Sequence, residues 1–251
     1  MTEEAIFTPG FATTPYWWEA APPPAPERIA LPDEVEALVI GGGIAGLSCA
    51  LELGRAGMKA LVLDREAIGW GASSRNGGAL SGAGSLGRAK SDITKGLDPT
   101  LLAAMVDEAE ASFEALEALI TREGIDCDWR RCGRFVAAHT EAAMTTLAKR
   151  AALLNSAGPG AAELLPRGRL AEELATARYH GGLVIARAGG LHPARYTLGL
   201  AAAAARHGAT LAGGVEVRGI AKEGAGFLVA TSGGAVQARQ VMVATNGYTG
   251  R

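Results

Sequence analysis

Two glycine-rich segments carry the residues whose types and spacing could do chemistry. The first is Gly41-Gly42-Gly43-Ile44-Ala45-Gly46, which satisfies the pattern GxGxxG. The second covers residues 69–78 and has the sequence GWGASSRNGG, which places two serines, an arginine and an asparagine between glycines. Glycine lets a backbone approach a ligand closely, and successive N–H groups form anion-binding concavities. Both segments are therefore candidates for holding an anionic group.

The first segment lies between an expected strand and an expected helix. Residues 37–40 (ALVI) form a short apolar run typical of a buried parallel strand, and residues 44–55 carry apolar side chains at helical spacing. Gly41 permits a tight turn, Gly43 lets the backbone approach a pyrophosphate, and Gly46 lets helix and strand pack closely. The N-terminus of the helix supplies oriented N–H donors for the phosphates.

A carboxylate stands where the second strand of this unit ends. Residues 60–63 (ALVL) are a second buried run, closed by Asp64, which follows Gly46 by 18 positions. A carboxylate there accepts hydrogen bonds from ribose hydroxyls and would repel a 2′-phosphate. GxGxxG alone is a weak signal in a chain with 35 glycines. The strand, the helix and the acid together predict a dinucleotide site, for NAD or FAD.

The second segment separates these two cofactors. Ser73, Ser74 and Arg75 can bring side chains and further backbone N–H groups to the same pyrophosphate and to the ring system beside it. A simple nicotinamide-binding fold has no need of such a loop. The segment favours FAD, and an NAD-dependent dehydrogenase stays as a weaker alternative that does not explain it.

The elements that must position these loops alternate between strands and helices. This order predicts an α/β class, a Rossmann-like FAD/NAD(P)-binding fold with a central parallel sheet, plus part of an α+β substrate domain. Asp98 and Pro99 start a long helix that runs to Gly124. Further strands are expected at 134–138, 182–186, 215–220, 227–231, 235–238 and 240–244, and further helices at 141–157, 169–177 and 193–207.

The expected domain organisation has three parts. Residues 1–34 hold Trp17, Trp18 and a run of three prolines, which suits an extended arm whose tryptophans dock on the body. A discontinuous FAD-binding domain covers 35–124 and 189–251. A partial substrate domain covers 125–188.

Composition excludes several classes of protein. With 251 residues and 48% hydrophobic content the chain can fill a core, and 24 Lys plus Arg against 26 Asp plus Glu leave no electrostatic footprint for nucleic acid. The acidic start MTEEAIF lacks the features of a signal peptide, and no apolar run is long enough for a transmembrane segment, so we expect a cytoplasmic protein. The three cysteines have neither disulfide nor zinc spacing, so no metal is expected.

The sequence resembles the FAD-dependent glycine/D-amino acid oxidase-like (DAO) flavoproteins, and within them the branch around gamma-glutamylputrescine oxidase. The resemblance covers nearly the whole chain, and its later segments are more specific than the first glycine motif. The matching segments are PYWW at 15–18, VIGGGIAGLSCALELGRAG at 39–57, VLD at 62–64, IGWGASSRNGG at 68–78, GGLHPARY at 189–196 and VMVATNGYT at 241–249.

This resemblance implies which residues touch FAD. The loop at 71–78 would pass the flavin, the backbone of Val217 would meet the adenine edge, and Asp64 would replace a glutamate found in many relatives. His192 is interpreted as a helix-entry residue before Pro193, and no catalytic residue is assigned. The implied FAD-binding residues are Gly41, Gly43, Ile44, Ala45, Gly46, Asp64, Arg65, Gly71, Ala72, Ser73, Ser74, Arg75, Asn76, Gly77, Gly78, Val217, Ala244 and Thr245.

The resemblance also implies a reaction and a partner. A small-molecule amine or amino acid would be oxidised at its C–N bond by hydride transfer to the flavin, giving an imine, then an aldehyde or keto acid, and hydrogen peroxide. Family members are longer, and the part after the last strand supplies much of their substrate domain. A missing C-terminal half or a partner chain is therefore expected. The alternative is a truncated, non-catalytic FAD- or nucleotide-binding module that acts only with a partner chain.

Overall fold

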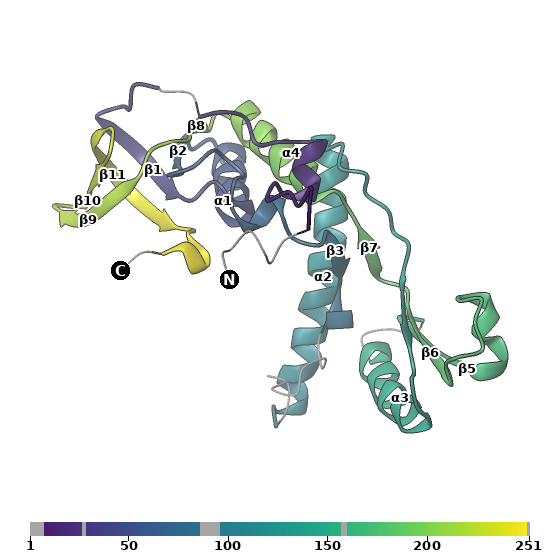
Figure 1. Cartoon of the computed structure of the whole chain (residues 1–251). Coiled ribbons are helices and arrows are strands. Elements are labelled where there is room, and N and C mark those ends of the chain that lie inside the picture. The colour runs from purple at the N-terminus through teal and green to yellow at the C-terminus, as the bar shows by residue number, and fades with distance from the viewer. Residues whose placement is uncertain (1–7, 27–28, 86–95, 157–159, 250–251) are drawn as a thin grey trace, which may run out of the picture. The chain divides into compact units, whose positions relative to one another are not determined.

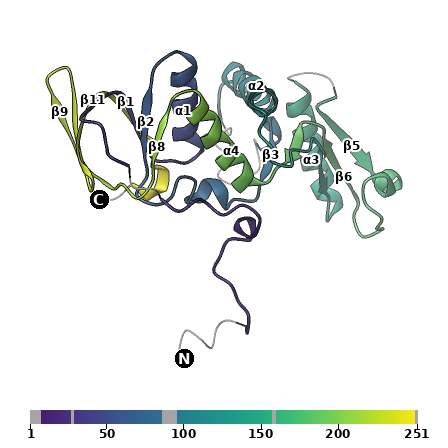
Figure 2. The same ribbon diagram turned by 90° about the horizontal axis from the view of Figure 1, so that it is seen from above.

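The computed structural model describes residues 8–26, 29–85, 96–156 and 160–249. The chain forms two compact units, which are shown in Figures 1 and 2. The first unit consists of Met1–Gly77, Ile125–Cys127 and His192–Arg251, and the second of Gly78–Gly124 and Asp128–Leu191. No helix in the described ranges has both the length and the apolar character needed to cross a membrane.

A six-stranded sheet forms the centre of the first unit, with strand order β8-β2-β1-β11-β10-β9. The first four of these strands run parallel, while β10 and β9 are antiparallel to their neighbours. The predicted α/β class with a mainly parallel central sheet is therefore confirmed. The bounds are β1 Glu34–Ile40, β2 Ala60–Leu63, β8 Thr210–Ala212, β9 Val217–Glu223, β10 Gly226–Thr231 and β11 Gly234–Val243.

Two helices, α1 (Ile44–Arg55) and α4 (Pro193–Arg206), pack side by side and contact β1, β2 and β8 (Figures 1 and 2). Their close approach needs a small residue, because a Cβ on Gly54 would overlap the backbone carbonyl of His207. α4 begins as the sequence indicates: Nδ1 of His192 accepts a hydrogen bond from the N–H of Arg195 at 3.2 Å. This side chain satisfies one of the free donors of the first helical turn.

The second unit contains a three-stranded antiparallel sheet, order β4-β6-β5, and a separate pair, β3 with β7. Asp98 caps the N-terminus of α2 by accepting from the N–H groups of Thr100 and Leu101, and Gly124 ends the helix at φ 62°. The bounds are β3 Ala79–Ser81, α2 Pro99–Glu123, β4 Arg134–Ala137, α3 Glu141–Asn155, β5 Ala162–Pro166, β6 Gly181–Ile185 and β7 Ala188–Gly190.

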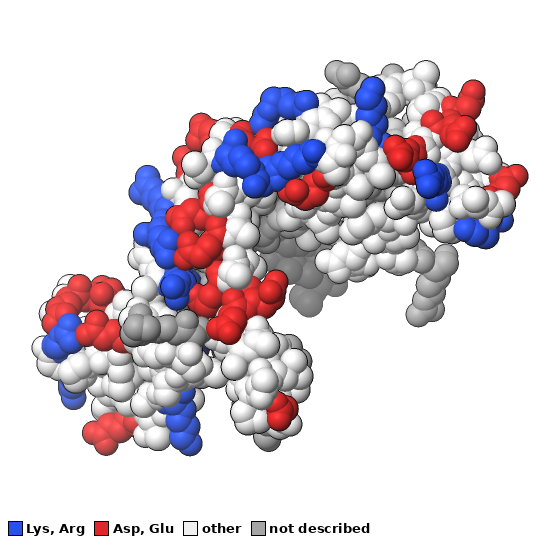
Figure 3. Space-filling view, turned by 180° about the vertical axis from the view of Figure 1, so that it is seen from behind, with Lys and Arg blue, Asp and Glu red and all other residues white. Residues whose placement is uncertain are grey.

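Charged side chains of both signs are interspersed on the surface that Figure 3 displays. Many of them form ion pairs within one unit. Arg131 contacts Glu114 at 3.1 Å and Glu117 at 2.8 Å, and Arg169 contacts Glu163 at 2.6 Å and Glu172 at 2.7 Å. These hydrogen-bonded carboxylates raise the pKa of both guanidinium groups, and Arg169 lowers the pKa of Glu172.

Four sequence expectations need correction. Residues 169–177 do not form a helix; a 3-10 helix covers Arg167–Glu172 instead. The strands expected at 235–238 and 240–244 are one strand, β11, because the polar Arg239 between them is exposed to solvent and does not interrupt the strand. The arm contains a 3-10 helix at Tyr16–Glu19. The short strands β3, β5, β7 and β8 were not expected.

The boundary between the units also differs from the expected one. Residues 78–124, which the sequence assigned to the FAD-binding domain, lie in the second unit. β3 pairs with β7 there, and Glu110 of α2 accepts a hydrogen bond from the N–H of Ala83 at 2.8 Å. The division into a cofactor domain and a substrate domain stays a prediction.

Candidate functional site

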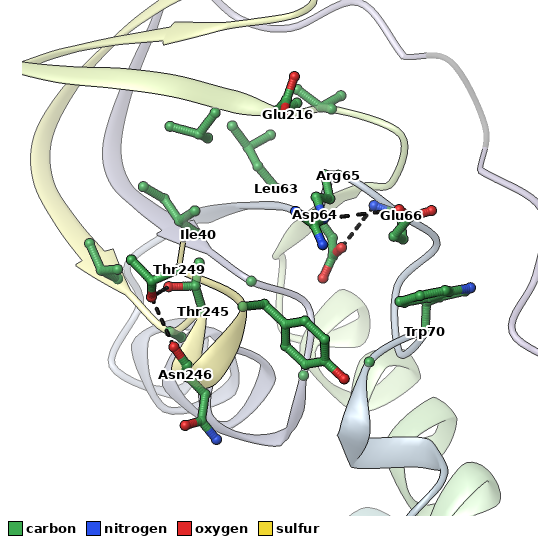
Figure 4. Close-up of a pocket in the computed structure, with 18 of the residues that line it drawn as sticks. Ile40, Leu63, Asp64, Arg65, Glu66, Trp70, Glu216, Thr245, Asn246 and Thr249 are labelled. Carbon is green, nitrogen blue, oxygen red and sulfur yellow. Dashed lines mark hydrogen bonds and ion pairs between the residues drawn. The ribbon is translucent and has the colours of Figure 1, made fainter. Parts of the chain in front are cut away.

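A pocket with a cavity volume of about 660 Å³ opens at the carboxyl ends of the parallel strands of the first unit. Ile40 ends β1, Leu63 ends β2 and Val243 ends β11, and all three line the pocket. Figure 4 shows Ile40 and Leu63 there. Open α/β sheets bind their ligands at this edge, and cofactor pockets have volumes of this order. The fold therefore brings the first glycine segment and Asp64 to one place.

The first glycine segment is shaped by close backbone contacts. Gly41 has φ 110°, a left-handed conformation that L side chains rarely adopt, and a Cβ there would lie 2.6 Å from the carbonyl oxygen of Ala244. A Cβ on Gly46 would overlap the carbonyl oxygen of Gly41. Two of the three motif glycines are thus needed for the turn and for the approach of α1 to the sheet.

The carboxylate of Asp64 is held at the pocket wall by two backbone amides. Its Oδ2 accepts from the N–H of Gly42 at 2.8 Å, and its Oδ1 accepts from the N–H of Glu66 at 2.9 Å. Figure 4 shows this side chain at the end of β2 beside Arg65 and Glu66. A carboxylate has about four acceptor sites, so each oxygen can accept one more hydrogen bond, for example from a ribose hydroxyl.

The second glycine segment meets the N-terminus of α1. Oγ of Ser73 accepts a hydrogen bond from the N–H of Ile44 at 3.0 Å, and a Cβ on Gly43 would lie 2.8 Å from the same oxygen. Ala72–Ser74 form a short 3-10 helix, whose first residues line the pocket. The structure therefore brings the two glycine segments together, as the expectation of a shared pyrophosphate site requires.

Ten of the predicted cofactor residues line this pocket and eight do not. The lining residues are Gly41, Gly43, Asp64, Arg65, Gly71, Ala72, Ser73, Val217, Ala244 and Thr245. The other eight are Ile44, Ala45, Gly46, Ser74, Arg75, Asn76, Gly77 and Gly78. Ser74 is fully buried, and Gly78 belongs to the second unit. Contact of all eighteen with FAD stays a prediction.

Most of the pocket-lining residues at the start of β9 and at the end of β11 were not predicted from the sequence. Hydroxyl groups organise part of this wall of the pocket: Oγ1 of Thr245 and Oγ1 of Thr249 lie 2.6 Å apart, and the latter also donates to the carbonyl of Asn246 at 2.9 Å (Figure 4). The resemblance segment VMVATNGYT already contained this signal. The missed lining residues are Ile40, Leu63, Glu66, Trp70, Val215, Glu216, Arg218, Gly219, Ile220, Val243, Asn246, Tyr248 and Thr249.

These features fit one half of a dinucleotide. The pocket offers a carboxylate for ribose hydroxyls, a side-chain-free backbone at Gly41 and Gly43 for a pyrophosphate, and apolar strand ends at Ile40 and Val217 for an adenine ring. The fold and the site together define a dinucleotide-binding α/β protein.

Residues 36–251 match the DAO family, described as FAD dependent oxidoreductase, and the chain belongs to this family. The predicted family and its cofactor, FAD, are thereby confirmed. The match begins just after the arm and includes both glycine segments and the whole wall of the pocket.

Individual relatives agree with this assignment. The gamma-glutamylputrescine oxidoreductase of Escherichia coli (strain K12) is 34% identical over 215 residues, which are 84% of this chain and 49% of the relative. A probable oxidoreductase, OrdL, of Rhizobium meliloti (strain 1021) is 28% identical and covers 100% of this chain and 58% of its own length. The chain spans about half the length of the relatives it matches.

A solved structure also supports the fold. The crystal structure of glycine oxidase from Geobacillus kaustophilus superposes with a TM-score of 0.71 at 25% sequence identity. The superposition covers 85% of this chain and 55% of that protein.

Proposed function

We propose that this chain supplies the FAD-binding part of an oxidoreductase that oxidises an amine or an amino acid at its C–N bond. The observation that carries the proposal is the pocket in which Asp64 and the two glycine segments meet. The similarity to a protein named gamma-glutamylputrescine oxidoreductase and to a glycine oxidase supports the substrate class.

The residues of the pocket bind and orient. Two backbone amides already fix the Asp64 side chain in the absence of a ligand. Little side-chain entropy is therefore lost when its carboxylate binds a ribose hydroxyl. Ser73 accepts from Ile44 and keeps its own hydroxyl proton to donate to a phosphate oxygen. The N-terminus of α1 adds a positive dipole end for the pyrophosphate.

The reaction then follows from the cofactor's chemistry. Bound FAD supplies a two-electron acceptor for the hydride that leaves the carbon beside nitrogen. The imine that remains reacts with water to give an aldehyde or keto acid and the free amine or ammonia. The two electrons pass finally to dioxygen, which takes up two protons and becomes hydrogen peroxide.

A second candidate function is a non-catalytic FAD- or nucleotide-binding module that acts only with further residues, from a longer form of the chain or from a partner chain. The exposed apolar side chains beside the pocket favour it. Met242, Val243 and Tyr248 are 41%, 56% and 45% exposed. Val243 and Tyr248 line the pocket itself, so residues of a longer chain or of a partner chain would cover apolar surface there.

One experiment separates the two candidates. The purified chain is loaded with FAD, freed of excess cofactor and mixed anaerobically with a panel of amines and amino acids, while the visible flavin absorbance is followed. Loss of this absorbance with at least one compound, and peroxide formation after oxygen is admitted, is the result expected for the oxidoreductase. Stable FAD binding without any bleaching supports the module, and a folded chain that takes up no FAD contradicts both.

A further inference from the structure

The guanidinium group of Arg75 contacts two neighbouring tryptophan rings, whose centroids are 6.4 Å apart. Its central carbon is 4.5 Å from the ring centroid of Trp18 and 4.2 Å from that of Trp70. One of its nitrogens also donates to the backbone carbonyl of Trp70 at 2.5 Å. Cation–π contacts of this kind are attractive, and they gain strength when the cation is withdrawn from water.

Arg75 has no carboxylate partner among the described residues, and its Nε is buried there without an acceptor. A buried donor left unsatisfied is costly, so the two ring faces must hold the side chain in place. The sequence had assigned Arg75 to FAD, but its guanidinium is directed to the tryptophans and does not line the pocket.

Both tryptophans of the arm are tied to the second glycine segment. Nε1 of Trp18 donates to Oγ of Ser74 at 2.9 Å, and Nε1 of Trp17 donates to the carbonyl of Asn76 at 2.8 Å. The ring of Trp17 also packs against His192, with centroids 4.8 Å apart. The docking expected from the sequence is present, and it is directed at the segment predicted to pass the flavin.

The same segment is held from α4 as well. The hydroxyl of Thr197, which is fully buried, lies 3.1 Å from the carbonyl oxygen of Ser73 and 2.8 Å from that of Pro193. Ser73 is the residue whose side chain caps the N-terminus of α1. The arm and α4 thus hold neighbouring residues of one short loop. The Ser73 side chain of this loop contacts the N-terminus of α1.

We propose that Trp18 is a positioning residue for the cofactor: through Arg75 and Ser74 it fixes the loop that carries Ser73. This inference rests on the proposed function, because it assigns the arm a role in FAD binding. The loop is predicted to meet the flavin half of FAD, whereas Asp64 and the first glycine segment serve the adenosine half. Ser73 is also proposed to contact the pyrophosphate, which ADP shares with FAD. Loosening the loop should therefore weaken binding of FAD and spare binding of adenosine, which has no phosphate.

The test compares FAD and adenosine binding by titration calorimetry in three variants of the 251-residue chain. Trp18→Leu removes the ring face and the N–H donor, Trp18→Phe keeps a ring face for Arg75, and Trp129→Phe is the matched control in the second unit. We expect Trp18→Leu to weaken FAD binding about tenfold and leave adenosine binding within about twofold. Trp18→Phe should recover most of the loss, to within about threefold of wild type.

A Trp18→Leu chain that binds FAD as wild type does, or that loses FAD and adenosine equally, overturns the proposal. Equal loss would mean general damage to the fold, and not a loosened loop. A wild-type chain that binds no FAD is a different result, because it contradicts the proposed function itself.

Limited trypsin digestion tests, without any cofactor, whether Trp18 holds the loop in place. Trypsin must bind an arginine side chain before it cleaves, and in this structure the Arg75 side chain is held against two rings. Mass spectrometry of Trp18→Leu should show cleavage after Arg75 at least about tenfold faster than in wild type, with Trp129→Phe unchanged. Equal cleavage rates in wild type and Trp18→Leu would show that Trp18 does not hold the loop.

Discussion

Oδ2 of Asp64 accepts a hydrogen bond from the backbone N–H of Gly42 at 2.8 Å, which joins the end of β2 to the turn after β1. The carboxylate stabilises this turn in addition to its proposed role as an acceptor for ribose hydroxyls. Both roles depend on its charge, because hydrogen bonds to an ionised acceptor are stronger than neutral ones.

Asp64→Ala should therefore weaken FAD and ADP binding together. We expect a loss of at least about tenfold for each ligand, the size of one charge-assisted hydrogen bond. Titration calorimetry measures both, with Asp33→Ala, an exposed aspartate before β1, as the matched control. Unchanged affinity for ADP in Asp64→Ala would show that this residue does not contribute to binding the adenosine half.

Gly46→Ala should destabilise the chain strongly. The added Cβ would overlap the carbonyl oxygen of Gly41, a backbone atom that cannot move away without opening the turn. The cost should reach at least about 3 kcal/mol in the free energy of unfolding. Gly168→Ala is the control, because a Cβ there meets nothing within 4 Å. Urea titration followed by circular dichroism checks the difference, and equal midpoints for the two variants would contradict the steric account.

Glu110 should matter more than Glu114, although both contact Arg187 in the second unit. Glu110 is buried, accepts from the N–H of Ala83 at 2.8 Å and lies 3.2 Å from Arg187, whereas the Glu114 side chain is 48% exposed. Glu110→Ala should cost about 2 to 3 kcal/mol, because it leaves the buried N–H of Ala83 without its acceptor and removes the nearer of the two carboxylates from Arg187. Glu114→Ala should cost less than about 1 kcal/mol. Chemical unfolding of the two variants is the check, and a larger loss in Glu114→Ala would reverse the ranking.

The Tyr196 hydroxyl should make the chain sensitive to high pH. Burial, with a smaller effect of Cys127, raises the pKa of Tyr196 from 10.0 to about 12. The folded state thus favours the neutral phenol, and the stabilisation is complete below pH 10.0 and is lost as pH rises through about 12.

The variant Tyr196→Phe isolates this effect. Between these two pH values wild type should lose about 2 to 3 kcal/mol more stability than Tyr196→Phe does. Denaturant unfolding at several alkaline pH values measures the difference. Tyr16→Phe serves as the control, since Tyr16 is 73% exposed. Parallel pH curves for wild type and Tyr196→Phe would exclude the tyrosine as the cause.

Local sequence patterns predicted the βαβ unit accurately, but they did not predict strand pairs between distant segments of the chain. The run before Gly41 and the run before Asp64 became β1 and β2, and α1 has the expected bounds, because the apolar patterns and glycines act within a few residues. β3 and β7 have three residues each and exist only because they pair with each other across a long stretch of sequence. A three-residue run gives no periodic pattern to recognise.

The candidate site shows the same division. Asp64 and Ser73 could be placed from motif and spacing, and both line the pocket. Arg75 could not be placed, because its partner Trp18 lies far away in the sequence and only the fold brings the rings around it. A charged residue in a glycine-rich loop suggested a ligand contact, which stays a prediction, and in the structure its guanidinium contacts two tryptophan rings.

The most direct test of the account is a calorimetric titration of the purified 251-residue chain with FAD. The account predicts saturable binding of about one FAD per chain, with ADP competing for the same site. A chain that is folded by circular dichroism and binds neither FAD nor ADP would contradict it.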